Sequence, residues 1–251
     1  MTYTVVSPAA WATSAGGTVV SGADWSIRAF DASTGALRWR YEFQPDTVNG
    51  AIISVTISGD TVYAVAEQLD PAGLNPKAVA MAVRLTDGTE LWRGVAPEPE
   101  RGGLRSAVIA GSLLIAGDYR GGVQAFDRLT GLRPWRTTGD PCCAGVTSAP
   151  IVRDNLLYYV SGDETVVALD LPSGSRRWTT NVPGSLIVQP ALCRDRLFAN
   201  NDYLYKFDRF TGAVVGIALN SETELPTSGI AAHGELAFVV GNDRVYAFRC
   251  D

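Results

Sequence analysis

One short pattern recurs along the chain: an aliphatic run, an Asp, a turn that ends in Gly, and a Trp four residues further on. The first copy, Ala29–Trp39, reads AFDASTGALRW. The later copies are Ala82–Trp92, Ala125–Trp135, Ala168–Trp178, the degraded Lys206–Gly216, and a sixth that begins at Ala247. A repeat of this kind is a supersecondary unit that cannot bury its apolar face alone, so neighbouring copies must stack on one another.

The period of the repeat indicates which unit is repeated. The positions equivalent to its Asp recur every ~40 to 50 residues, the length of a four-stranded propeller blade, and are Asp31, Arg84, Asp127, Asp170, Asp208 and Arg249. Alternating apolar and polar residues, punctuated by Gly-Asp, Thr-Gly and Asp-Asn turns, favour strands over helices. In the fourth copy the strands are predicted at residues 149–152, 156–160, 165–169 and 176–180.

The two ends of the chain complement each other. The last copy supplies only three strands, at residues 230–232, 236–240 and 244–248, and the chain opens with a lone strand at residues 2–6. Pairing the first strand onto the last sheet removes exposed sheet edges. We therefore predict an all-β, six-bladed β-propeller of four-stranded antiparallel blades, closed into a ring by the N-terminal strand, as one domain over residues 1–251.

The A-x-D-x-x-T-G-x-x-x-W pattern resembles the tryptophan-docking repeat of propellers that bind pyrroloquinoline quinone (PQQ) and of their cofactor-free relatives. Those relatives include outer-membrane assembly lipoproteins and sensor domains of bacterial Ser/Thr kinases. The resemblance implies an extracytoplasmic location, periplasmic or at the cell surface, although Met1–Ala10 lacks the features of a signal peptide. It also implies a structural role, docking between neighbouring blades, for Trp39, Trp92, Trp135 and Trp178, whereas Gly216 departs from the pattern.

Composition argues against several functions. The net charge of -5 and the absence of a Lys/Arg run disfavour nucleic-acid binding, and no apolar stretch is long enough to insert into a membrane. His233 is the single histidine, which excludes a His-rich metal site. It is also the only candidate base for a Ser-His-Asp site, and its predicted place in a turn between two strands does not suit that role. The sequence therefore predicts a monomeric ring that acts as a binding or scaffolding module, with no catalytic residue and no metal site.

Insertions into the repeat suggest where a partner binds. They cover residues 67–77, 97–103 and 221–226 and map to one rim of the propeller. Departures from a repeat often carry the binding surface, although this rim is equally interpreted as the side where extra length is tolerated. We expect a protein partner, and the candidate binding residues are Asp70, Lys77, Glu98, Glu100, Arg101, Arg105, Tyr119, Arg120, Glu222 and Glu224.

The resemblance leaves a second function open, a quinoprotein that binds PQQ with calcium as a dehydrogenase or as the sensor domain of a receptor kinase. Its candidate cofactor-binding residues are Trp11, Trp25, Cys142 and Cys143. The adjacent cysteines are either a vicinal disulfide beside a cofactor, as in PQQ alcohol dehydrogenases, or two small residues in a tight loop. Cys193 and Cys250 map to the opposite rim, one blade apart, which leaves a bridge between them open.

Overall fold

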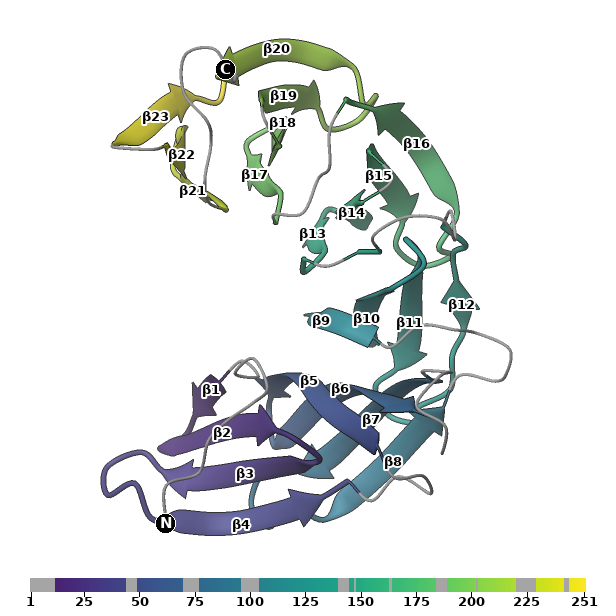
Figure 1. Cartoon of the computed structure of the whole chain (residues 1–251), viewed down its shortest axis with the longest axis vertical. Helices are drawn as coiled ribbons and strands as arrows, with labels where there is room; N and C mark the ends of the chain where they lie inside the picture. Colours follow the sequence, from purple (N-terminus) through teal and green to yellow (C-terminus); the bar gives the residue numbers. More distant parts are fainter. Residues whose placement is uncertain are drawn as a thin grey trace. The chain divides into compact units, whose positions relative to one another are not determined.

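The structure is a computed structural model that describes residues 12–43, 49–69, 77–95, 104–139, 145–146, 148–162, 164–183, 189–201, 203–219, 229–241 and 244–251. Within these ranges the chain forms strands and turns, and the strands make six antiparallel sheets (Figure 1). The same ranges contain no helix long and apolar enough to cross a membrane. The predicted all-β propeller class is confirmed, and the sheets are named blades 1 to 6 in chain order.

The chain divides into two compact units, each of which is described by itself. Unit 1 comprises Met1–Tyr119 and Gln124–Arg136, and unit 2 comprises Arg120–Val123 and Thr137–Asp251. Unit 1 carries blades 1 to 3 and unit 2 carries blades 4 to 6. That residues 1–251 form a single domain stays a prediction.

In unit 1 the strands of each blade pair in chain order. Blade 1 consists of β1 (Ala12–Ala15), β2 (Thr18–Ala23), β3 (Ser26–Asp31) and β4 (Leu37–Glu42). Blade 2 consists of β5 (Asn49–Ser58), β6 (Thr61–Leu69), β7 (Lys77–Arg84) and β8 (Glu90–Val95). Blade 3 consists of β9 (Leu104–Ala110), β10 (Leu113–Asp118), β11 (Val123–Asp127) and β12 (Trp135–Arg136).

Unit 2 repeats this arrangement, except that blade 6 has three described strands. Blade 4 consists of β13 (Ile151–Arg153), β14 (Leu156–Ser161), β15 (Thr165–Asp170) and β16 (Arg176–Asn181). Blade 5 consists of β17 (Ala191–Cys193), β18 (Arg196–Asn200), β19 (Leu204–Asp208) and β20 (Val214–Leu219). Blade 6 consists of β21 (Ile230–His233), β22 (Leu236–Val240) and β23 (Val245–Arg249). The strand at residues 2–6 lies outside the described residues, so the closure of the ring stays a prediction.

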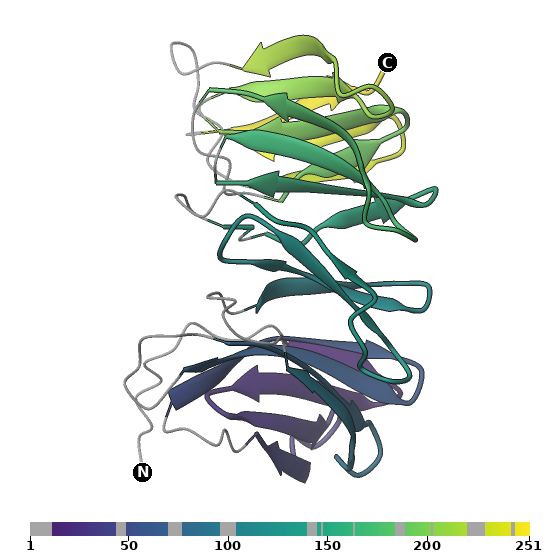
Figure 2. The ribbon, with the colours of Figure 1, turned by 90° about the vertical axis from the view of Figure 1, so that its right-hand side faces the viewer.

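The two ends of a blade differ in how they connect strands. At one end, the turn end, short turns join the first strand to the second and the third to the fourth. In blade 4 the first of these turns places Asp154 and Asn155 at φ of 52° and 60°, which matches the twist of a tight hairpin. The turns of unit 2 lie together at one side (Figure 2). The other end, the loop end, carries the second-to-third connection and the passage to the next blade.

A β-bulge precedes the tryptophan in the outer strand of most blades. In blade 1, Ala29 pairs with Trp39 and Phe30 pairs with Leu37, so Arg38 is left without a cross-strand partner in the ladder. Blades 2 and 4 show the same register shift before their tryptophans, and blade 5 shows it before Gly216. A bulge re-aims the side chains that follow it, and here it sets the position from which the tryptophan reaches the next blade.

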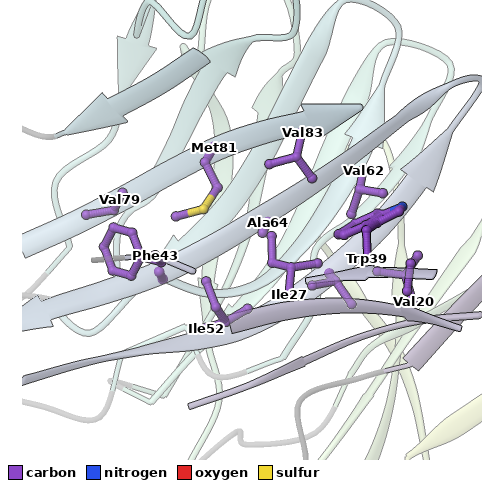
Figure 3. Packing of buried hydrophobic residues seen from close by; sticks show 13 residues of the cluster. Val20, Ile27, Trp39, Phe43, Ile52, Val62, Ala64, Val79, Met81 and Val83 are labelled. Atoms are coloured by element: carbon purple, nitrogen blue, oxygen red, sulfur yellow. The ribbon is translucent and has the colours of Figure 1, made fainter. Parts of the chain in front are cut away.

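The core lies between the faces of neighbouring blades. In unit 1, one apolar cluster joins Val20, Ile27 and Trp39 of blade 1 to Val62 and Met81 of blade 2 (Figure 3). In unit 2 a similar cluster joins blades 4 and 5. Burying apolar area contributes roughly 25 cal/mol per Å², so within each unit the blades stabilise their neighbours, as the repeat predicts.

Candidate functional site

The outer-strand tryptophans dock onto the next blade in a fixed way. The indole N–H of Trp39 donates to the backbone carbonyl of Leu85 at 2.7 Å, that of Trp92 to Arg128 at 2.7 Å, and that of Trp178 to Arg209 at 3.0 Å. In each pair the acceptor is the residue after the Asp position of the repeat in the following blade. We call this arrangement the tryptophan clamp.

The clamp also depends on the glycine of the turn that it contacts. A Cβ added to Gly88 would lie 2.6 Å from Cε3 of Trp39, and one added to Gly131 would lie 2.5 Å from Cε3 of Trp92. At Gly212 the same atom would lie 2.6 Å from Cδ2 and Cε3 of Trp178. Since real Cβ atoms do not approach so closely, only glycine lets the indole ring rest on the turn.

The Asp of the repeat builds this turn. In blade 3, Oδ1 of Asp127 accepts hydrogen bonds from the backbone N–H groups of Leu129 and Thr130 and from the Thr130 hydroxyl. Gly131 closes the turn by donating its N–H to the Asp127 carbonyl at 2.9 Å. The Thr130 hydroxyl and these backbone donors hold the pKa of Asp127 below its ordinary value, because each of them favours the ionised carboxylate.

Trp135 and Gly216 do not share this docking geometry. Trp135 is half-buried, and its indole nitrogen meets no hydrogen-bond acceptor among the described residues. Gly216 pairs with Lys206 in the register in which Trp178 pairs with Ala168, so it stands at a tryptophan position. A docking role is therefore supported for Trp39, Trp92 and Trp178, and for Trp135 it stays a prediction.

Two arginines that the sequence analysis did not single out reinforce the clamps. Arg128 donates from Nη2 to the Ser58 hydroxyl of blade 2 at 2.8 Å, and its guanidinium lies 4.9 Å from the centre of the Tyr63 ring. Arg209, whose side chain is 6% exposed, donates to Asp154 of blade 4 at 2.7 Å. The sequence contains a signal for both residues, because an Arg directly follows the Asp of the repeat in the third and fifth copies.

The candidate binding residues that the structure describes lie at loop ends. Lys77 begins β7, Arg105 lies near the start of β9, and Tyr119 and Arg120 follow β10. The insertion at residues 67–77 was interpreted as a loop, but its first three residues extend β6 and Lys77 pairs with Gln68. The others, which lie outside the described residues, are Asp70, Glu98, Glu100, Arg101, Glu222 and Glu224.

Arg105 and Tyr119 form the best-defined feature at the loop end of blade 3. The guanidinium carbon of Arg105 lies 3.6 Å from the centre of the Tyr119 ring, which brings together a residue of the first strand and the residue that follows the second strand of one blade. Nε of Arg105 is buried and meets no acceptor among the described residues. Burial lowers the pKa of Arg105, and the charge of Glu67 opposes that shift. Tyr119 is 38% exposed and Arg105 is half-buried, so the pair is partly accessible to solvent.

The predicted cofactor residues are not brought together by the described part of the chain. Trp25 lies at the loop end of blade 1, with 43% of its surface exposed, while Trp11, Cys142 and Cys143 lie outside the described residues. Among the described residues, no group of three or more His, Cys, Asp or Glu side chains is arranged to hold a metal ion. His233 ends β21 and is exposed.

One cysteine pair is resolved by the structure. Cys193, the last residue of β17, forms a disulfide with Cys250, which follows β23, and their Cα atoms are 5.6 Å apart. Each cysteine is only 2% exposed. The bridge that the sequence left open is therefore present in unit 2, where it joins blades 5 and 6.

Solved structures with the same fold have different activities. BamB from Moraxella catarrhalis superposes with a TM-score of 0.70 at 20% identity, over 93% of this chain and 68% of that one. The computationally designed Ika8 protein gives 0.74 at 17% identity, over 97% and 71%. Quinohemoprotein alcohol dehydrogenase from Comamonas testosteroni gives 0.67 at 18% identity, over 93% of this chain but 45% of the enzyme. At such identities the likeness shows the fold alone.

Comparison of the sequence with family models identifies the family of the chain. Curated protein sequences give no significant match. The family model described as outer membrane protein assembly factor BamB matches residues 5–249, nearly the whole chain and all the copies of the repeat. The chain therefore belongs to the family of the outer membrane protein assembly factor BamB.

Proposed function

We propose that this protein is a non-catalytic scaffold that binds another protein through the loop ends of its blades. The observation that carries the proposal is the pair of Arg105 and Tyr119, a cation stacked on a partly exposed ring at the loop end of blade 3. Tyr and Arg are the residue types most often found at the centre of protein interfaces. The family supports this, since an assembly factor acts through contact with other proteins.

The pair has the properties of an interface centre rather than of a folding element. Stacking on the ring fixes the guanidinium plane, so little side-chain entropy is lost when a partner binds. The buried Nε of Arg105 finds no acceptor among the described residues, and a partner carboxylate or carbonyl would supply one. Lys77, at the loop end of blade 2, adds a second cation on the same side of unit 1.

A photo-crosslinking experiment in the host cell tests this proposal. A photoreactive phenylalanine analogue replaces Lys77 at the loop end or, as a control, Leu132, which is 70% exposed at the turn end of blade 3. We expect a discrete protein adduct from position 77, none from position 132, and loss of the adduct when Arg105→Ala is added. The Arg105→Ala variant must keep the thermal unfolding of the parent chain. Equal adducts at both positions, or none at position 77, would contradict the proposal.

A second experiment distinguishes the scaffold from the quinoprotein alternative. Titration of the purified chain with PQQ and calcium, followed by tryptophan fluorescence, is expected to show no saturable change. Saturable quenching would overturn the non-catalytic proposal, and dye reduction with alcohols or sugars would then separate a dehydrogenase from a sensor.

We also propose an extracytoplasmic location. A buried disulfide persists in oxidising compartments and is rare in the cytosol, and the bridge between Cys193 and Cys250 is of this kind. Fractionation of host cells is expected to recover the protein with the envelope or the periplasm, whereas recovery with a cytosolic marker would contradict this location.

A further inference from the structure

The residue that accepts the indole hydrogen bond, which we call the receiving position, makes two backbone hydrogen bonds. The carbonyl of Arg209 accepts the indole N–H of Trp178 from blade 4, while the N–H of Arg209 donates to the Asp195 carbonyl in the first turn of its own blade at 3.2 Å. Arg128 does the same with Trp92 and with Ser112. The residue after the Asp position is therefore the point at which one blade holds the next.

Between blades 5 and 6 the donor half of this clamp is missing. Gly216 stands at the tryptophan position of blade 5, and a Cβ added there would meet no atom within 4 Å. Glycine has no side chain, so position 216 supplies no donor that corresponds to the indole N–H of the other clamps.

The receiving position of blade 6 is nevertheless present, and it is a cysteine. Cys250 follows Arg249, the Asp position of the sixth copy, and its N–H donates to the Glu235 carbonyl in the first turn of blade 6 at 3.0 Å. This hydrogen bond is equivalent by position to the one that the N–H of Arg209 donates to the Asp195 carbonyl in blade 5. From this position the side chain of Cys250 forms the disulfide with Cys193 of blade 5.

We propose that the disulfide between Cys193 and Cys250 replaces the tryptophan clamp at the one described junction within a unit where the tryptophan has been lost. It joins the same two blades at the same receiving residue, and a covalent bond there performs the task of an indole hydrogen bond and ring contact.

Blade 6 needs such a bond more than the other blades of unit 2. Its first strand, β21, has one half-buried and three exposed residues, and its third, β23, alternates exposed and half-buried ones. Its buried apolar residues, Ala237, Val239 and Cys250, cluster with Cys193, Phe198 and Leu204 of blade 5. Because the burial is small, a link that closes a separation of 57 residues stabilises the attachment strongly.

The test uses amide hydrogen exchange in three versions of the whole chain. The first is Cys193→Ala with Cys250→Ala, the second adds Gly216→Trp, and the third adds Gly229→Trp instead, at a position where a Cβ also meets no atom within 4 Å but which lies outside the clamp register. The peptide that reports on blade 6 is β22, and the internal reference is β14 in blade 4.

We expect exchange in β22 to become faster by on the order of 100-fold without the disulfide, with β14 unchanged. Gly216→Trp is expected to recover about five-fold of this protection, the contribution of one hydrogen bond, because the backbone carbonyl of residue 250 remains as an acceptor, and Gly229→Trp is expected to recover none. If the cysteine-free chain fails to fold, Gly216→Trp is expected to restore a folded protein where Gly229→Trp does not.

Three results would overturn the proposal. They are unchanged exchange in β22 after loss of the cysteines, equal loosening of β14 and β22, and failure of Gly216→Trp to recover more than Gly229→Trp does.

Discussion

The contact between Trp92 and Gly131 can be tested by adding a single methyl group. In Gly131→Ala the new Cβ would lie 2.5 Å from Cε3 of Trp92, against ~3.5 to 4 Å for a normal contact, so the ring or the turn must move by about 1 Å. Overpacking of this kind costs about 1 to 3 kcal/mol. Gly131 also has φ of +71°, which costs a residue with a side chain about 1 to 2 kcal/mol. We therefore expect Gly131→Ala to lower the free energy of unfolding by roughly 2 to 5 kcal/mol.

Gly35 provides the matched control. It occupies the same turn position in blade 1 with φ of +72°, but a Cβ there meets no atom within 4 Å. Gly35→Ala is expected to show only the backbone cost of about 1 to 2 kcal/mol. Urea unfolding followed by far-ultraviolet circular dichroism avoids a signal from Trp92 itself. If the two variants lose the same stability within about 0.5 kcal/mol, the ring of Trp92 does not rest on this turn and the clamp is wrong.

The other predictions concern the hydrogen bonds and ends of the same framework. Trp92→Phe keeps most of the ring but removes the donor to Arg128, so urea unfolding is expected to show a loss of about 1 kcal/mol, and no loss would make that bond unimportant. The turn donors depress the pKa values of Asp87, Asp127 and Asp208. Their contribution is therefore full above the unfolded pKa of about 4 and is lost as pH falls through the folded value. The urea midpoint is expected to be flat between about pH 7 and about pH 5 and to fall below about pH 4, with a shallower fall in Asp127→Asn. Deletion of residues 1–6 is expected to expose the edge of blade 6 and cause aggregation in light scattering, whereas a soluble monomer with an unchanged melting temperature would contradict ring closure.

Much of the fold could be predicted because the repeat encodes its own boundaries. The predicted strands of the fourth copy, at residues 149–152, 156–160, 165–169 and 176–180, agree with β13 to β16 to within two residues at each end. A Gly in five copies, preceded in four of them by the Asp of the repeat, specifies a turn by local chemistry, so these turns can be identified without knowledge of the rest of the molecule. The six sheets follow from counting the copies of the repeat, including the sixth that begins at Ala247.

The features that the sequence did not predict depend on contacts between copies. Arg209 bonds to Asp154, which is 55 residues away, and no local pattern joins them. The disulfide between Cys193 and Cys250 became assignable only when blades 5 and 6 were placed side by side. At the loop ends, the stacking of Arg105 on Tyr119 depends on the register of β9 and β10, which the repeat does not fix. The binding role of this pair stays a prediction.

The acceptor of each tryptophan clamp is a backbone carbonyl, so the indole hydrogen bond does not depend on which side chain the accepting residue carries. Leu85, Arg128 and Arg209 all receive an indole equally well. A substitution at residue 85 therefore keeps the indole acceptor, whereas a substitution at residue 128, 209 or 250 also removes a side-chain link to the previous blade. The same position can therefore carry a second link to the previous blade through its side chain, as Arg128, Arg209 and Cys250 do. The junction between two blades thus combines one contact that is indifferent to the side chain of the accepting residue with a second contact that this side chain determines.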